Sequence, residues 1–149
     1  MNDNQPARAR YDTDTVAWAE QQADALRRRA TNEIDWDNVA EEINDLARSD
    51  RREIRNRLVV ICTHLLKWAH SPGEAPSSWR GSIQEARHQI ADLIEESPSL
   101  HDYPATVLAK SYARGRENAR YETGRADLPP ICPWTIEQVL DVDFLPSEC

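Results

Sequence analysis

The sequence predicts an all-α protein: a bundle of four main helices, one of them long with a candidate kink, followed by a short C-terminal helix. Apolar residues recur at three- and four-residue steps, and no segment alternates apolar and polar residues convincingly. The chain has four glycines, and the first is Gly73, so long helices can form without a break. The length predicts a single domain over residues 1–149, with 1–11 as a flexible N-terminal arm and 125–149 as a loop, a short helix and a packed tail.

The first helix is predicted to begin between Asp12 and Asp14, because carboxylates favour the positive end of the helix dipole. Its end is predicted at Arg27–Arg29, where cations are favoured. Its expected apolar stripe consists of Val16, Ala19, Ala23, Leu26 and Ala30.

The second helix is the long one, with Asp35 as its candidate N-cap. It begins at Trp36, and neither Gly nor Pro interrupts it before Pro72. A break, if the helix has one, is placed at Arg48–Asp50, because Ser and Asp side chains compete for backbone hydrogen bonds. The expected apolar stripe consists of Val39, Ala40, Ile43, Ala47, Ile54, Leu58, Ile61, Leu65 and Trp68.

The third helix follows a loop at Ser71–Ser78 that is rich in Pro, Gly and Ser. Either Ser77 or Ser78 can cap this helix, which is expected to stop at Ser97-Pro98. Its apolar side carries Trp79, Ile83, Ala86, Ile90, Leu93 and Ile94.

The fourth helix is predicted to begin at Pro104, with Gly124 as its C-cap glycine. Its stripe consists of Val107, Leu108, Tyr112, Gly115 and Ala119. In the tail, Thr135 and Gln138 have the spacing of a capping box, which predicts a short helix ending near Asp141.

Charge and composition exclude several classes of function. The net charge of -8 disfavours nucleic acid as a partner, and the arginine clusters alternate with acidic residues. The N-terminus does not resemble a secretory signal, and the longest apolar run, Leu58–Cys62, is too short to span a bilayer. We therefore expect no membrane partner and a cytoplasmic location in a bacterium. Three irregularly spaced cysteines argue against a disulfide framework, and a pairing of Cys132 with Cys149 is disfavoured.

Glu85 and His88 have the i, i+3 spacing that di-iron bundles use on two of their helices. That pair occurs once in this chain, and the stripe through Ile83, Ala86 and Ile90 places it on the far side of its helix. A solvated helix face is the favoured interpretation. We expect no stoichiometric iron, no cofactor and no metal, and we predict no catalytic residue.

Four polar residues follow the flank of the long helix's apolar stripe: Asp50, Glu53, Arg57 and His64. The favoured interpretation is a ladder of salt bridges that fixes helix packing. The alternative is a polar pocket, with His64 as the acid–base group and Arg57 as an anion ligand. The sequence supplies no nucleophile or metal for a mechanism there.

Aromatic and basic residues bracket the Pro72–Ser78 loop: Trp68, His70, Trp79 and Arg80. The favoured interpretation is that both tryptophans close the end of the bundle over the loop. The alternative is an interaction site, because Trp and Arg are enriched in protein-binding hot spots and can also stack on bases.

Several strings, in order along nearly the whole chain, resemble domain-of-unknown-function family 29, a family of small bacterial proteins. The resemblance implies an all-helical single domain with no assigned activity, cofactor or catalytic residue. It draws attention to His64, Trp68, Trp79 and Arg80, which lie inside matching strings. Two positions depart from the family pattern, Ala47 in place of a glycine and Trp134 in place of a more common tyrosine. The matching strings are Tyr11-Asp12 with Asp14, Asp35–Ile43, Arg48–Glu53, His64–Trp68, Ser78–Arg80, Ser97–Leu100, Glu122–Gly124, Cys132–Thr135 and Asp143–Pro146.

The sequence thus predicts a non-enzymatic protein-interaction module that acts through another protein or as a homo-oligomer. The alternative is a small ligand-binding protein or enzyme that uses a polar pocket near His64. The candidate interaction or pocket residues are Asp50, Arg57, His64, Trp68, Trp79 and Arg80.

Overall fold

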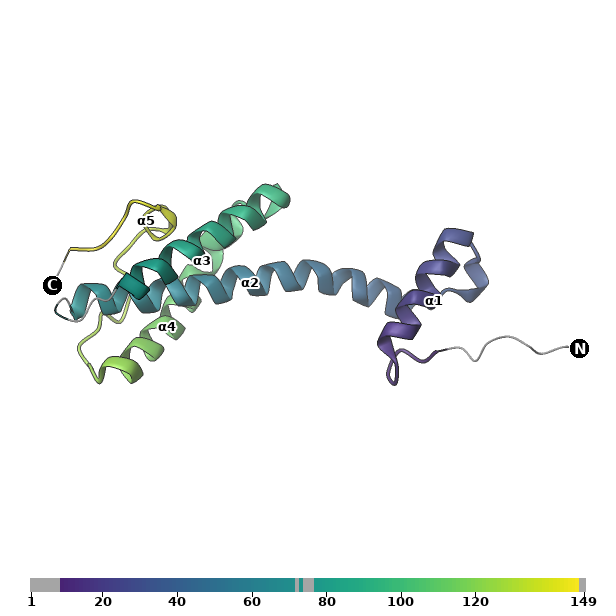
Figure 1. Cartoon of the computed structure of the whole chain (residues 1–149), viewed down its shortest axis with the longest axis horizontal. Helices are drawn as coiled ribbons and strands as arrows, with labels where there is room; N and C mark the ends of the chain where they lie inside the picture. The colour runs from purple at the N-terminus through teal and green to yellow at the C-terminus, as the bar shows by residue number, and fades with distance from the viewer. Residues whose placement is uncertain (1–8, 72, 74–76, 148–149) are drawn as a thin grey trace, which may run out of the picture. The chain divides into compact units, whose positions relative to one another are not determined.

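The computed structural model describes residues 9–71, 73 and 77–147, and most of these residues are helical while none lies in a strand, as predicted (Figure 1). The chain divides into two compact units, Met1–Arg48 and Ser49–Cys149, here termed the N-terminal and C-terminal units. No helix in the described part of the chain is long and apolar enough to cross a membrane. The helices are α1 (Thr15–Arg28), α2 (Trp36–His70), α3 (Ser77–Glu96), α4 (Tyr103–Thr123) and α5 (Ile136–Leu140), with short 3-10 turns η1 (Thr31–Glu33) and η3 (Pro98–Leu100).

The long helix α2 is continuous over its 35 residues, and the candidate break at Arg48–Asp50 is helical. Strong helix formers flank Ser49 and Asp50 on both sides, so the competing side chains do not interrupt the backbone hydrogen bonds. The local helix signals are confirmed at other ends. Asp14 caps α1 by accepting a hydrogen bond from the Ala17 amide, and Gly124 ends α4 with a φ of 70°.

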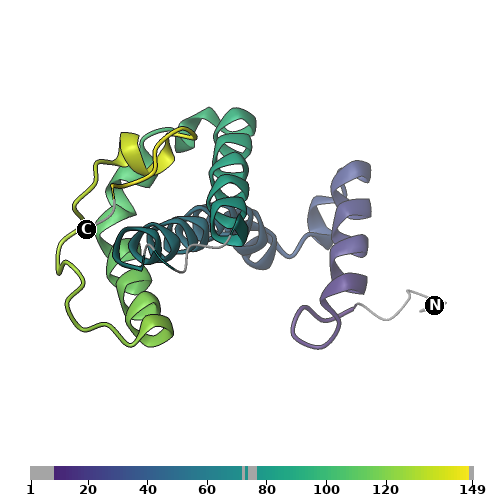
Figure 2. The ribbon, with the colours of Figure 1, turned by 60° about the vertical axis from the view of Figure 1, so that its left-hand side comes forward.

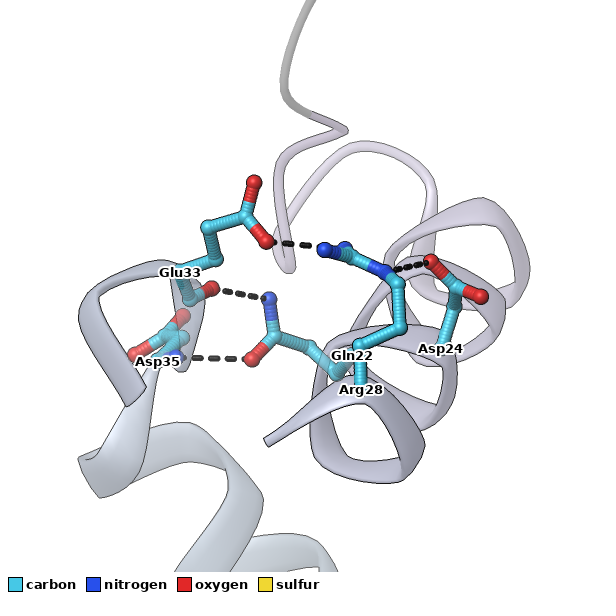
Figure 3. A network of polar contacts seen from close by, with 5 residues as sticks. All are labelled: Gln22, Asp24, Arg28, Glu33 and Asp35. Atoms are coloured by element: carbon cyan, nitrogen blue, oxygen red, sulfur yellow. Dashed lines mark hydrogen bonds and ion pairs between the residues drawn. The ribbon is translucent and has the colours of Figure 1, made fainter. Parts of the chain in front are cut away.

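The N-terminal unit has a small apolar interior and a large share of polar contacts. Its buried apolar residues among those described are Trp18, Ala25 and Ile34, and Gln22 is buried beside them. The Gln22 side chain accepts from the Asp35 amide at 2.7 Å and donates to the Glu33 carbonyl at 3.1 Å (Figure 3). One amide side chain therefore joins α1 to the segment that leads into α2.

Ion pairs and a tyrosine hydroxyl extend this polar network. Arg28 contacts Asp24 at 2.7 Å and Glu33 at 2.8 Å (Figure 3). The Tyr11 hydroxyl donates to the Glu42 carboxylate at 2.5 Å, and this hydrogen bond raises the pKa of Tyr11 to about 12. The strings Tyr11-Asp12 and Asp35–Ile43 thus meet in the N-terminal unit.

The predicted apolar stripe of the first helix is wrong. Trp18, Gln22 and Ala25 form the buried side of α1, whereas Val16 is 70% exposed and Leu26 is also exposed. Trp18 can be buried because its indole N–H donates to the Asp35 carboxylate at 3.1 Å, and Gln22 because both ends of its amide are paired. The buried side of α1 includes Gln22, a polar residue whose hydrogen bonds are made. A prediction that counts apolar residues alone therefore misses this side.

The C-terminal unit packs α3 and α4 on two sides of the second half of α2 (Figure 2). One core cluster joins α2 to α3, and a second joins α2 to α4 and the tail. Cys62 lies in the second cluster as a small apolar residue, as predicted, and burial raises its pKa. The first cluster comprises Ile54, Leu58, Ile61, Leu65, Ile83, Ala86, Ile90, Leu100 and Val139.

The C-terminal tail is held by hydrogen bonds as well as by burial. The predicted capping box is present, with Thr135 and Gln138 each bonded to the other's backbone. Arg87 of α3 is 2% exposed, and its Nε donates to the Val139 carbonyl at 2.8 Å. The Tyr112 hydroxyl donates to the Pro129 carbonyl at 2.6 Å. The tail therefore covers α3 and α4 through specific polar contacts.

Candidate functional site

The six residues singled out from the sequence all lie in the C-terminal unit. α2 carries Asp50, Arg57, His64 and Trp68, and α3 carries Trp79 and Arg80. Arg57 Nε lies 2.7 Å from the Glu53 carboxylate one turn earlier, and Asp50 is half-buried on the same helix. The Arg57–Glu53 contact is the kind of helical ion pair that the salt-bridge interpretation expects.

His64 and Trp79 come together across α2 and α3. Their ring centroids are 6.5 Å apart, with an angle of 38° between the planes. His64 is half-buried, and its Nδ1 atom is buried with no hydrogen-bond partner among the described residues. A buried polar atom without a partner costs free energy, so this nitrogen is the least satisfied group of the cluster.

Lys67 completes the cluster by contacting both neighbouring helices. Its Nζ lies 2.7 Å from the Glu122 carboxylate on α4 and 4.5 Å from the centroid of the Trp79 ring on α3. The Lys67 side chain is 11% exposed, so the ion pair is shielded on its lysine side. The sequence drew attention to His64 and Trp79, but the pairing of Lys67 with Glu122 joins residues 55 positions apart and has no local signal. We call His64, Lys67, Trp79 and Glu122 the His64 cluster.

Electrostatics in the His64 cluster favour a neutral imidazole. Burial lowers the pKa of His64, the positive charge of Lys67 lowers it further, and Glu122 raises it. A neutral imidazole beside a held ammonium group can accept a proton or help to bind an anion.

We expect the stability of the fold to fall as the pH drops below about 6.5, the ordinary pKa of His. Because the His64 pKa is lower in the folded chain, the unfolded chain binds more protons in this range, and acidification favours unfolding until the folded-state pKa is passed. Urea unfolding from about pH 5 to 8 measures this slope. His64→Gln should flatten it, and His88→Gln, at an exposed histidine on α3, should not. Equal profiles for the wild type and His64→Gln would contradict the prediction.

The remaining predicted residues are less closely connected. Trp68 is half-buried, and Arg80 is exposed on the first turn of α3. Most of the Pro72–Ser78 loop lies outside the described residues, as does Cys149. Glu85 and His88 are both exposed, which confirms their placement on the far side of α3. Across the described residues, no group of three or more His, Cys, Asp and Glu is arranged to hold a metal ion.

A different feature stands out in the N-terminal unit, where α2 leaves large apolar side chains uncovered. Trp36 is 57% exposed, Ile43 is 62% exposed and Leu46 is 70% exposed. Steps of seven and three residues place them on one side of the helix, which we call the α2 apolar face. The predicted burial stripe is therefore wrong over Val39–Ala47, because Tyr11 and Trp18 make polar contacts to Glu42 and to Asp35, the residue before α2, instead.

A groove of about 770 Å³ adjoins the start of the α2 apolar face, within the N-terminal unit. Trp36 belongs to both the face and the groove. The other groove-lining residues that bear on binding are Arg10, Tyr11, Asp12, Trp18, Asp35 and Asp37, and Arg10 lies 3.4 Å from the Asp12 carboxylate. A second cavity, of about 320 Å³, lies between Arg87, Ile94 and Leu140 in the C-terminal unit. Neither of these two cavities is lined by His64.

Comparison with known proteins identifies one family. The model of the family described as domain of unknown function DUF29 matches residues 10–145, which is nearly the whole chain. Neither a curated protein nor a solved structure shows a significant match to the chain. The family match agrees with the strings Asp35–Ile43 and His64–Trp68 noted in the sequence.

Proposed function

The chain belongs to the DUF29 family, and we propose that it is a non-enzymatic protein-interaction module whose docking site is the α2 apolar face. The observation that carries the proposal is the exposure of Trp36, Ile43 and Leu46 on one side of a helix. Single exposed apolar residues are normal on protein surfaces, whereas three that share a helix face indicate a surface that another chain covers.

The size of the N-terminal unit supports the same conclusion. A unit of fewer than 50 residues buries a small fraction of its surface and gains little from a core alone. Here the described apolar interior is Trp18, Ala25 and Ile34, while comparable apolar side chains on α2 remain in water. Covering the α2 apolar face with a partner would add the apolar burial that the unit lacks, at roughly 25 cal/mol per Å².

Site-specific photo-crosslinking tests the proposal in the full chain. We expect a benzophenone amino acid at Ile43 to give a discrete adduct in cells, with a partner that mass spectrometry identifies. The matched control carries the same group at Ile131, which is 78% exposed in the C-terminal unit. Adding Leu46→Ser should reduce the Ile43 adduct about tenfold, since the two side chains share the face. Equal adducts from positions 43 and 131 would contradict the proposal.

A second candidate function is supported by the buried, unpartnered Nδ1 of His64. In this alternative, the His64 cluster binds a small anion, and the other candidates selected from the sequence lie on the same two helices: Asp50, Arg57, Trp68 and Arg80. Inorganic phosphate and acetate are the probes. A saturable NMR shift of the His64 ring, without one of His88, would support a binding site. Unchanged His64 signals at about 10 mM of either anion, well above typical ligand concentrations, would exclude it for these anions.

A further inference from the structure

We infer that the partner of the α2 apolar face is a basic amphipathic helix of another protein, an inference that rests on the proposed function. An exposed helix stripe is commonly covered by another helix that contributes apolar residues at i, i+3, i+4 and i+7. What distinguishes this face is the charge around it, and that charge selects the partner.

The segment that carries the α2 apolar face is acidic. Residues 31–47 contain six carboxylates and no Lys, Arg or His. Within the described residues, Arg48 pairs with Glu41 at 2.7 Å and with Asp45 at 2.8 Å, and Arg28 pairs with Glu33. The segment itself carries six carboxylates and no basic residue, so it has a negative field that attracts a cationic partner. The six carboxylates are Glu33, Asp35, Asp37, Glu41, Glu42 and Asp45.

The groove beside Trp36 has the chemistry to receive a basic side chain from such a helix. Trp36 and Tyr11 supply aromatic rings, and Asp37 supplies a carboxylate. Arg10 also lines the groove and pairs with Asp12 at 3.4 Å, so Asp37 is the carboxylate that a partner's basic group would meet. A guanidinium group can stack on an aromatic ring while it donates hydrogen bonds to a carboxylate. A basic residue near one end of the bound helix would therefore occupy the groove while its apolar side covers Ile43 and Leu46.

A second copy of this chain fits the face poorly. Two copies that paired through residues 31–47 would bring like-charged segments together, which is unfavourable. The basic stretch at residues 48–57 could supply charge but not an apolar side, because Ile54 is fully buried. Its Arg51 and Arg55 already contact Tyr103. The acidic segment likewise repels nucleic acid phosphates.

A displayed library of helical peptides tests the inference on the full chain. Apolar residues are fixed at i, i+3, i+4 and i+7, and the other positions are randomised. We define the relevant clones as those that bind the wild type and bind an Ile43→Ser/Leu46→Ser variant about tenfold more weakly. Their affinity for an Ile131→Ser variant should be unchanged. Both sites are exposed, so the variants should remain folded, which circular dichroism checks.

We expect the relevant clones to carry a net positive charge. Replacing their Arg and Lys by Gln should weaken binding about tenfold at 0.1 M salt, and less at 0.5 M salt. Asp37→Asn should weaken basic clones, whereas Asp92→Asn, at an exposed position on α3, should not. Neutral or acidic clones that depend on the face would overturn the inference and leave the proposed function intact. A second copy crosslinked at Ile43 would also overturn it, and the absence of both face-dependent clones and an Ile43 adduct would overturn both proposals.

Discussion

Gly115→Ala should lower the free energy of unfolding by about 2 kcal/mol, as overpacked cores do. A Cβ at position 115 would lie 2.9 Å from the Cys62 Cβ, 3.0 Å from the Thr63 amide nitrogen and 3.1 Å from the Val59 carbonyl oxygen. These atoms belong to the α2 backbone or lie next to it, so no flexible side chain can move aside. α4 would have to shift away from α2 and loosen the second core cluster.

The matched control is Gly81→Ala, for which the opposite sign is expected. Gly81 lies inside α3, and a Cβ there would meet nothing within 4 Å. Alanine should therefore raise the free energy of unfolding by about 0.5–1 kcal/mol through its better helix propensity. Urea unfolding followed by circular dichroism measures both variants. A Gly115→Ala protein as stable as Gly81→Ala would show that α4 does not approach α2 this closely.

Local signals were sufficient to predict most of the fold. Asp14, Gly124 and the Thr135–Gln138 box each mark a helix end, and the structure confirms all three because capping depends on neighbouring residues. The absence of Gly and Pro from Trp36 to Ser71 likewise predicted the long α2. Helix positions are thus encoded locally in this chain.

The buried face of each helix was harder to predict. Periodicity shows which side of a helix is apolar, but it does not show whether another element covers that side. Ile43 continues the apolar pattern that Ile54 and Leu58 follow, yet Ile43 is exposed and the other two are fully buried. Gln22 and Arg87 are buried although both are polar, since each finds backbone partners from distant segments. Such partners are set by the tertiary fold and leave no local mark in the sequence.

For the candidate sites too, single residues could be selected from the sequence, whereas the contacts between distant residues could not. His64 and Trp79 were both selected from the sequence, and they lie in one cluster. The contacts that complete the cluster join Lys67 to α4 through Glu122, which no spacing rule predicts. The α2 apolar face was missed because Ile43 was assigned to a core stripe that did not include Trp36 or Leu46. Only the exposed fractions of the side chains distinguish an interface from a core.

Arg87→Met should lower the free energy of unfolding by about 3 kcal/mol, because it removes a buried charged donor from the Val139 carbonyl. Arg87 Nε donates to the Val139 carbonyl at 2.8 Å, and Arg87 also donates to the Gln138 carbonyl at 3.4 Å. Both carbonyls lie near the end of the five-residue helix α5. The Gln138 carbonyl also accepts from the Asp141 amide at 3.3 Å, so the Val139 carbonyl is the one that depends on Arg87. Methionine keeps most of the apolar stem, so the change isolates the hydrogen bonds from the packing.

Hydrogen exchange separates this mechanism from a general loss of stability. We expect the amides of α5 to lose protection first, while those of α3 around Ile90 follow the global change. Arg87→Lys should lose about half as much stability, because the ammonium group can reach one carbonyl but lacks the planar guanidinium fork. Arg80→Met, at an exposed position on the same helix, should change stability by less than about 0.5 kcal/mol. If Arg87→Met left α5 as protected as in the wild type, capping and apolar burial at Val139 would be sufficient to hold the tail, and the buried guanidinium would not be needed for docking it.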